Sequence, residues 1–124
     1  MSDVIREPAA GRDYHCPIPS SSTTWLMSVP CVLGNLIHAA TMSAAACAGR
    51  CVWTLPALHC SLAQLVDAVG QVYGAASTGR VSYGSNPALE RNFGRYPPLR
   101  TPAAEAAGFV HDGDLSTLVR RALT

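Results

Sequence analysis

The stretch Trp25–Gly49, WLMSVPCVLGNLIHAATMSAAACAG, contains no Asp, Glu, Lys or Arg. The uncharged region is wider still, because none of these residues separates Asp13 from Arg50. About twenty consecutive apolar residues are enough to span a bilayer. Pro30, however, would interrupt a helix that began at Trp25, and Ser28 stands where a helix N-cap belongs. The stretch therefore predicts a short strand at 25–27 and a separate helix, not one membrane span.

The predicted helix follows Ser28 and ends near Met42. Its apolar residues have helical spacing: Val32, Leu33, Leu36, Ile37 and Ala40. Gly34, Asn35 and His38 fall between them. A helix of about a dozen residues is too short to cross a bilayer, so we expect a buried helix in which His38 is a satisfied structural residue.

Outward from this helix, the pattern predicts further short elements. Strands are expected at 14–18, 51–55 and 80–83, because these segments are rich in β-branched or aromatic residues. Ser61 and Gln64 form a capping-box pattern at the start of a helix that Gly74 ends. Helical segments are also expected at 87–93, at 101–108 and after Asp112 or Asp114. The sequence thus predicts a small α+β domain with about four short strands and four helices.

The charge balance excludes several functions. The chain has 124 residues, enough for one domain, and its nine basic residues nearly balance eight acidic ones. No polybasic surface therefore indicates nucleic-acid binding. All nine basic residues are arginines. The absence of lysine excludes Schiff bases, P-loops and Tyr-Lys pairs from this sequence.

The cysteines and the N-terminal residues suggest an intracellular chain. Residues 1–13 carry charges of both signs and no apolar segment, unlike a secretory signal. Five cysteines do not form the even framework of a small secreted protein. We therefore expect a cytoplasmic protein with reduced thiols. Cys47 and Cys51 are expected to be buried small hydrophobes and not metal ligands.

No catalytic, cofactor or metal site can be assigned from motifs. The sequence contains no G-x-G-x-x-G turn. Tyr96 and Arg100 imitate the spacing of a Tyr-x3-Lys pair, but two prolines between them oppose the necessary helix. His59 and Cys60 are neighbours in an extended segment and should point in opposite directions. Capping explains Asp112 and Asp114 better than paired acid-base chemistry does.

The order of several segments resembles that of a known family. These segments are VIREPAAGRDYHCPIP (4–19), WLMS (25–28), NLIHAA (35–40), VWTLPAL (52–58), SLAQLV (61–66) and AAEAAGF (103–109). In this order they resemble the C-terminal substrate-binding part of the NAD-dependent epimerase/dehydratase family, the extended short-chain dehydrogenases. Within that family they are most similar to D-erythronate dehydrogenase-like proteins, from Val4 to about Ala122. The family's helix often begins Ser-Pro-Arg-Arg, whereas this chain has Ser28-Val-Pro-Cys31 and lacks both arginines.

The resemblance implies an enzyme of two lobes. A Rossmann lobe holds NAD or NADP with the catalytic Ser/Thr, Tyr and Lys, and a smaller lobe closes over a sugar or sugar-acid substrate. Residues 1–124 would form a single substrate-binding lobe with the Rossmann lobe absent, binding no cofactor alone. In the full enzyme, Trp25 and the helix after it are expected to pack between the lobes, where charges would be desolvated. Without the other lobe, part of that surface would face water.

Four residues are candidates for substrate contacts. Thr24 and Trp25 are candidates for a hydroxyl donor and an apolar wall beside a polyol chain. Ser28 is a further candidate, with N-capping as its alternative role. Arg6 is the candidate partner of a carboxylate or phosphate, with a solvated surface charge as the alternative.

The sequence is compatible with three functions. The favoured one is the substrate-binding portion of an NAD-dependent sugar or sugar-acid dehydrogenase or a nucleotide-sugar epimerase, inactive by itself. The second is a stand-alone binding or dimerisation module derived from that lobe, which associates through its exposed apolar surface. The third is a membrane-associated protein that uses residues 25–49.

Overall fold

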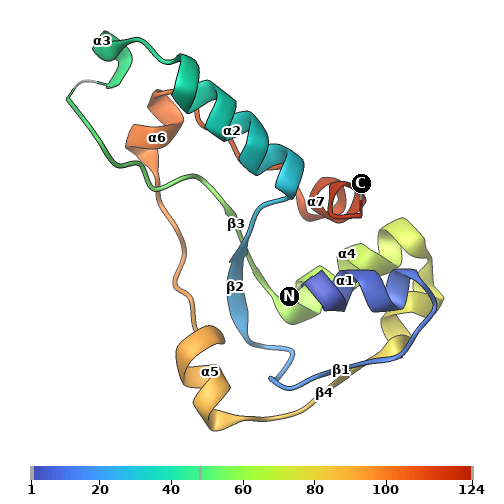
Figure 1. Ribbon diagram of the computed structural model, residues 1–124. Helices are drawn as coiled ribbons and strands as arrows, with labels where there is room; N and C mark the ends of the chain where they lie inside the picture. The colour runs from blue at the N-terminus through green and yellow to red at the C-terminus, as the bar shows by residue number, and fades with distance from the viewer. Residues whose placement is uncertain (1, 48, 124) are drawn as a thin grey trace.

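The computed structural model describes residues 2–47 and 49–123 (Figure 1). Within these residues the chain forms four strands, seven α-helices and one 3-10 helix. The strands are β1 (Tyr14–Cys16), β2 (Thr23–Leu26), β3 (Leu58–Ser61) and β4 (Val81–Tyr83). The α-helices are α1 (Ser2–Ala9), α2 (Val29–Thr41), α3 (Ala44–Cys47), α4 (Leu62–Tyr73), α5 (Pro87–Phe93), α6 (Pro102–Ala106) and α7 (Leu115–Arg121). The 3-10 helix, η1 (Ala75–Arg80), joins α4 to β4.

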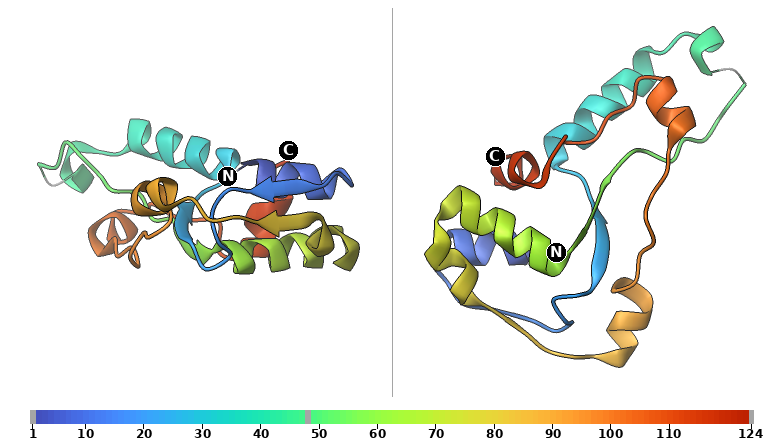
Figure 2. Two further views of the ribbon diagram at one scale, coloured as in Figure 1. Left: turned by 90° about the horizontal axis from the view of Figure 1, so that it is seen from below. Right: turned by 180° about the vertical axis from the view of Figure 1, so that it is seen from behind.

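The hydrophobic core lies in one half of the molecule, where β1 and β4 pair in parallel beside α1, α4 and α7 (Figures 1 and 2). Helix α4 supplies the centre of this core, since Leu62, Leu65 and Val69 are fully buried. Val4 of α1 and Val119 of α7 pack into the same cluster. Burying side chains of this size provides most of the driving force for folding such a small domain.

A second sheet, the antiparallel pair β2 and β3, connects the core to the rest of the chain. Helix α2 leaves the end of β2 and extends away from α1 and α4, with α3 and α6 near its far end (Figure 1). Helix α5 lies at another corner and is joined to α6 by an extended segment (Figures 1 and 2). The molecule is therefore a packed core with an extended, thinly covered arm.

Most of the predicted elements are present. The capping box of Ser61 and Gln64 is formed, and Gly74 follows α4 with φ of 99°. Ser28 caps α2 by accepting a hydrogen bond from the Cys31 amide, and Asp114 caps α7. The predicted strands at 14–18 and 80–83 correspond to β1 and β4, and the prediction of an α+β fold with four short strands is confirmed.

Several boundaries differ from the prediction. The prediction of a strand at 51–55 is wrong. The strand that pairs with β2 is β3, which begins seven residues later in the chain. The strand expected at 25–27 begins earlier, at Thr23. Three helical elements were not predicted: α1, with Pro8 inside it, the single turn α3 and the 3-10 helix η1. Elements this short depend on tertiary contacts more than on their own propensity.

The apolar face of α2 is exposed, which contradicts the burial expected from its spacing and agrees with the expectation, from the family resemblance, that part of this surface faces water without a second lobe. Its buried residues are Cys31 and Asn35, whereas Leu33, Leu36 and Ile37 are 54%, 55% and 66% exposed. The spacing correctly predicted one apolar face, but that face points to solvent. The physical reason is that α2 packs against irregular backbone at 107–112, whose carbonyl and amide groups need polar partners.

Two further expectations concern the membrane and the thiols. Among residues 2–47 and 49–123, no helix has the length and apolar character that crossing a membrane requires. The expectation that Cys47 and Cys51 are buried is wrong, because Cys51 is exposed and Cys47 is half-buried. Cys16, Cys31 and Cys60 are the buried thiols.

Candidate functional site

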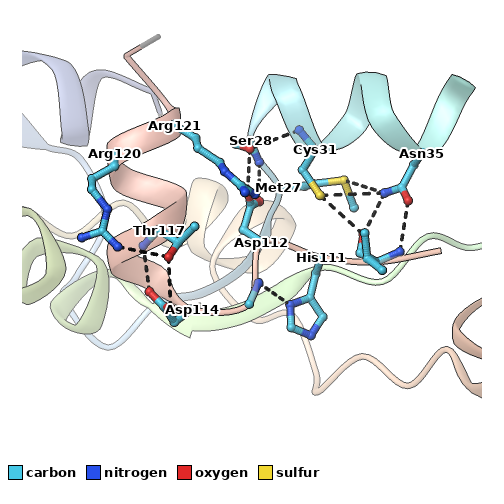
Figure 3. Close-up of polar contacts among 12 residues, drawn as sticks. Met27, Ser28, Cys31, Asn35, His111, Asp112, Asp114, Thr117, Arg120 and Arg121 are labelled. Carbon is cyan, nitrogen blue, oxygen red and sulfur yellow. Dashed lines mark hydrogen bonds and ion pairs between the residues drawn. The ribbon is translucent and has the colours of Figure 1, made fainter. Parts of the chain in front are cut away.

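Ser28 lies at the junction of β2, α2 and the segment before α7 (Figure 3). Its amide donates to Asp112 Oδ2 at 2.8 Å, and its hydroxyl donates to Asp112 Oδ1 at 2.6 Å. The same hydroxyl oxygen accepts from the Cys31 amide at 3.3 Å. Arg121 Nη1 donates to Asp112 Oδ1 at 3.1 Å. One carboxylate thus ties the start of α2 to α7.

The Asp112 side chain has no exposed surface, and Figure 3 shows it between Ser28 and Arg121. Burial alone raises the pKa of this carboxyl, because it disfavours the charged form. The hydrogen bonds from Ser28 and the interaction with Arg121 outweigh burial and lower the pKa below its ordinary value of 3.8. Asp112 is therefore an ionised structural clamp, which explains why it does not cap α7 as Asp114 does.

The inward face of α2 is polar and binds backbone. Asn35 Nδ2 donates to the Val110 carbonyl at 2.8 Å, and the Val110 amide donates to Asn35 Oδ1 at 3.0 Å. His38 Nε2 lies 2.8 Å from the Ala107 carbonyl, and its ring packs edge-on against Phe109. The prediction of a satisfied structural His38 is confirmed. The Asn35 side-chain amide both donates to and accepts from the Val110 backbone, as a residue of a paired β-strand does.

The outward face of α2 is apolar and wide. Val29, Leu33, Leu36 and Ile37 are each more than half exposed, and α2 contains no Asp, Glu, Lys or Arg. At 100° per residue these four side chains lie on one side of the helix. An apolar patch of this kind marks an interaction surface more often than an unused one.

Arg6 and Ser28 line the same cavity of about 220 Å³, between α1, the start of α2 and α7. Its other walls are largely apolar and include Leu26, Val29 and Leu118. The Arg6 side chain is exposed at 58% and forms ion pairs with Asp3 and Glu7. Hydrogen bonds from Arg12 and Arg6 lower the pKa of Glu7 to about 2. The cation therefore already has two carboxylate partners.

Thr24 and Trp25 lie elsewhere, on opposite faces of β2. Thr24 is buried at 5% exposure, whereas Trp25 is 36% exposed. The Trp25 ring stacks on Tyr96 at a centroid distance of 4.9 Å, and its Nε1 donates to the Pro97 carbonyl at 2.7 Å. The structure thus brings Arg6 and Ser28 together, and it places Trp25 in a separate aromatic pair.

Side chains of β2 and β3 hold the segment that carries Tyr96. Thr23 Oγ1 donates to the Tyr96 carbonyl at 2.8 Å, and His59 Nε2 lies 2.8 Å from the same oxygen. His59 is opposite Trp25 in the β2–β3 register, while its neighbour Cys60 is buried at 1% exposure. The prediction that His59 and Cys60 do not form a dyad is confirmed. No sequence pattern connects Tyr96 with Trp25, because 70 residues separate them.

Comparison with known proteins identifies relatives of the chain. No family model matches it. It is 28% identical to a D-erythronate dehydrogenase of Cupriavidus necator over 120 residues, 96% of this chain. It is 24% identical to a D-erythronate dehydrogenase of Haemophilus influenzae over 122 residues, 98% of the chain. The chain resembles D-erythronate dehydrogenases. The resemblance expected from the sequence segments is thereby confirmed.

The chain spans 37% and 39% of the lengths of these two relatives. Its fold matches the crystal structure of a nucleoside-diphosphate-sugar epimerase from Agrobacterium tumefaciens with a TM-score of 0.85. That match covers 94% of this chain and 34% of the epimerase chain, at 22% identity. The likeness establishes the fold, which is that of one part of a longer protein.

Proposed function

We propose that the chain is the substrate-binding lobe of an NAD- or NADP-dependent enzyme that acts on a sugar or sugar acid. In this proposal residues 1–124 form one lobe, which is inactive until it packs against a cofactor-binding lobe. The observation that carries the proposal is the apolar outer face of α2, in a chain that spans little more than a third of its dehydrogenase relatives.

The residues of this chain do not fit a nicotinamide dinucleotide. A dinucleotide pyrophosphate needs a Gly-rich turn between a strand and a helix. Here β4 is followed by Gly84-Ser85-Asn86 and then the short helix α5, and no G-x-G-x-x-G occurs anywhere in the sequence. The family's catalytic lysine also has no counterpart, because the chain contains no lysine. We therefore assign cofactor binding and proton transfer to the other lobe.

The two faces of α2 have different roles in this proposal. The inner face holds the 107–112 backbone through Asn35 and His38, which fixes the helix to its own lobe. The outer face, with Leu33 near its centre, would cover apolar surface of the cofactor lobe. Burial of four such side chains contributes roughly 25 cal/mol per Å² of apolar area removed from water. An uncharged α2 suits this position, because an unpaired charge there would be desolvated.

The substrate contacts that we propose come from Arg6 and Trp25. Arg6 and Ser28 share the cavity beside α7, where a guanidinium is suited to the carboxylate of a sugar acid. Trp25 and Tyr96 offer stacked rings to the apolar face of a sugar. Thr24 and Ser28 are buried, at 5% and 3% exposure, and the Ser28 hydroxyl already bonds to Asp112 and the Cys31 amide, so the proposal gives neither residue a substrate contact.

A chimera tests the proposed function. This chain would replace the matched part of the Cupriavidus necator enzyme, and NADH formation would be measured with D-erythronate and other sugar acids. We expect turnover from the chimera and none from the 124-residue chain alone. Turnover by the isolated chain would contradict the claim that it needs a second lobe.

Matched variants locate the contact between the lobes. Leu33→Asp should abolish activity of the chimera, because it places a charge in the proposed interface. Ala39→Asp adds the same charge on the flank of α2, where the residue is also exposed, and should retain most activity. Equal loss in both variants would show that the outer face has no special role.

The same apolar face also favours a second candidate, a stand-alone module that dimerises through α2. Sedimentation of the isolated chain separates the two candidates. A stable dimer that Leu33→Asp dissociates, together with an inactive chimera, would favour the module over the enzyme lobe.

A further inference from the structure

The far end of the arm contains a second candidate binding site, remote from the core. A pocket of about 210 Å³ lies between residues 50–54, which follow α3, and the start of α6. These segments lie at the end of the molecule that carries α3, and α6 lies beside the C-terminal part of α2 (Figure 1). The pocket is lined by two arginines, Arg50 and Arg100, together with Trp53 and the hydroxyl residues Thr54 and Thr101.

The two arginines differ from several others in the chain. Arg6, Arg12, Arg80 and Arg121 form ion pairs, whereas Arg50 and Arg100 form none with a carboxylate that the structure describes. Two cations at one small pocket repel each other, and an anion between them would remove this repulsion. A guanidinium also presents paired N–H donors that match two oxygens of a phosphate.

Trp53 gives the pocket a fixed aromatic wall. Its ring packs against buried Phe109 at a centroid distance of 5.4 Å. The Arg50 guanidinium lies over the Trp53 ring, 5.6 Å from its centroid. Phe109 is in turn held by His38 of α2. The wall is thus anchored to the helix, while the Arg50 guanidinium contacts the ring and forms no ion pair with a carboxylate that the structure describes.

One acidic residue is close to the site. Thr101, which is 7% exposed, donates its hydroxyl to Glu105 at 2.8 Å. Among the described residues, Glu105 has the one carboxylate that bonds to a residue lining the pocket. Its negative charge would weaken the binding of an anion, and it therefore provides a variant with the opposite expected effect.

We propose that this pocket binds the phosphate group of a small organophosphate. Arg50 and Arg100 pair with the phosphate oxygens, and Trp53 contacts the organic part of the ligand. The site does not depend on the proposed enzyme function, because all of its residues belong to this chain and it requires neither NAD nor a second lobe.

The experiment titrates the 124-residue chain with phenyl phosphate and with inorganic phosphate at constant ionic strength. Binding is measured by calorimetry, and the indole N–H signals of Trp53 and Trp25 are followed by NMR. We expect 1:1 binding that shifts the Trp53 signal but not the Trp25 signal. Phenyl phosphate should bind roughly 2- to 10-fold more tightly, as expected for contact between two aromatic rings.

Substitutions test the assigned residues. Arg50→Gln and Arg100→Gln should each weaken phosphate binding by about tenfold or more, the loss expected for a charge-assisted hydrogen bond. Arg91→Gln, which removes an exposed arginine outside the pocket, should change affinity less than about twofold, in line with the small effect of exposed charges. Glu105→Gln should strengthen binding.

Several outcomes would overturn the proposal. These are the absence of saturable 1:1 binding, an equal loss in Arg91→Gln, or a shift of Trp25 in place of Trp53. If a glutamine variant fails to fold, Arg50→Lys and Arg100→Lys decide, because they keep the charge but lose the paired donors. Unchanged affinity in both lysine variants would contradict the assignment of the arginine pair.

Discussion

Helices α2 and α4 have similar lengths and both have an apolar face, but they use it in opposite ways. In α4 the apolar residues are inside, and Leu62, Leu65 and Val69 have no exposed surface. In α2 the apolar residues are outside, and the inward positions belong to Cys31 and Asn35. Periodicity therefore identifies a helix and its apolar face, whereas the surrounding structure determines whether that face packs against the core or is exposed.

The largest expected effect is the loss of packing in α4. Leu65→Ala should lower the free energy of unfolding by about 2–5 kcal/mol, because it leaves a cavity in the core. Leu33→Ala in α2 removes the same atoms from a half-exposed site and should cost less than about 0.5 kcal/mol in the isolated chain. Urea unfolding of both variants measures the contrast. Similar losses would mean that the outer face of α2 is already covered in the isolated chain.

The polar inner face of α2 should have the next largest effect. Asn35→Ala removes both hydrogen bonds to Val110 and should lower the free energy of unfolding by about 2 kcal/mol. Gln71 is an exposed polar residue of α4, and Gln71→Ala provides the control. Amide hydrogen exchange at Val110 should accelerate in Asn35→Ala alone. An unchanged exchange rate there would contradict the proposed hold on the 107–112 backbone.

A smaller and pH-dependent effect is expected at Asp112, which ties α2 to α7. Its pKa is lowered on folding, so its stabilising contribution is complete above about pH 4 and is lost as the pH falls through the folded-state value. Asp112→Asn should therefore cost about 1–2 kcal/mol at pH 7 and progressively less below pH 4.

Unfolding of the wild type and the variant from about pH 2 to about pH 7, a range that includes the ordinary carboxyl pKa of about 4, measures the difference. Asp67→Asn is the control, since Asp67 is exposed on α4. A constant difference between wild type and Asp112→Asn at every pH would rule out the ionised clamp.

The smallest expected effect is a difference in thiol reactivity between the core and the arm, which is measured without any substitution. Cys60 is buried beside the core, and burial raises its pKa, so it should react slowly with a thiol reagent. Cys51 is exposed in the arm and should react first. Mass spectrometry of partly modified protein measures the order. Rapid modification of Cys60 in the folded protein would indicate that the core opens more easily than its packing implies.

The sequence predicted the parts of the fold that depend on local chemistry. The capping residues Ser28 and Ser61 were predicted, and Asp114 was one of two candidates with Asp112, because a side-chain oxygen two or three residues before a free amide is a local signal. The position of β3 was missed, since its pairing with β2 depends on contacts between residues 32 to 38 positions apart. The spacing alone predicted the wrong environment for the apolar face of α2, because spacing does not identify what a face packs against, whereas the family resemblance led us to expect an exposed surface here.

Prediction of the candidate site was more limited. Arg6 and Ser28 do line one cavity, although the ion pairs of Arg6 with Asp3 and Glu7 had no clear sequence signal. Trp25 was chosen from the family resemblance, but Tyr96 was considered only as part of a false Tyr-x3-Lys pattern. The two rings meet because the 94–98 segment lies along β2, which is a non-local arrangement.

In the proposed function, the outer face of α2 is covered by a cofactor-binding lobe. Hydroxyl-radical footprinting of the isolated chain and of the chimera measures this directly at Leu33, Leu36 and Ile37. We expect these residues to be oxidised readily in the isolated chain and strongly protected in the chimera, while Val52, which is 82% exposed, changes little. Equal oxidation of the α2 residues in both proteins would contradict the claim.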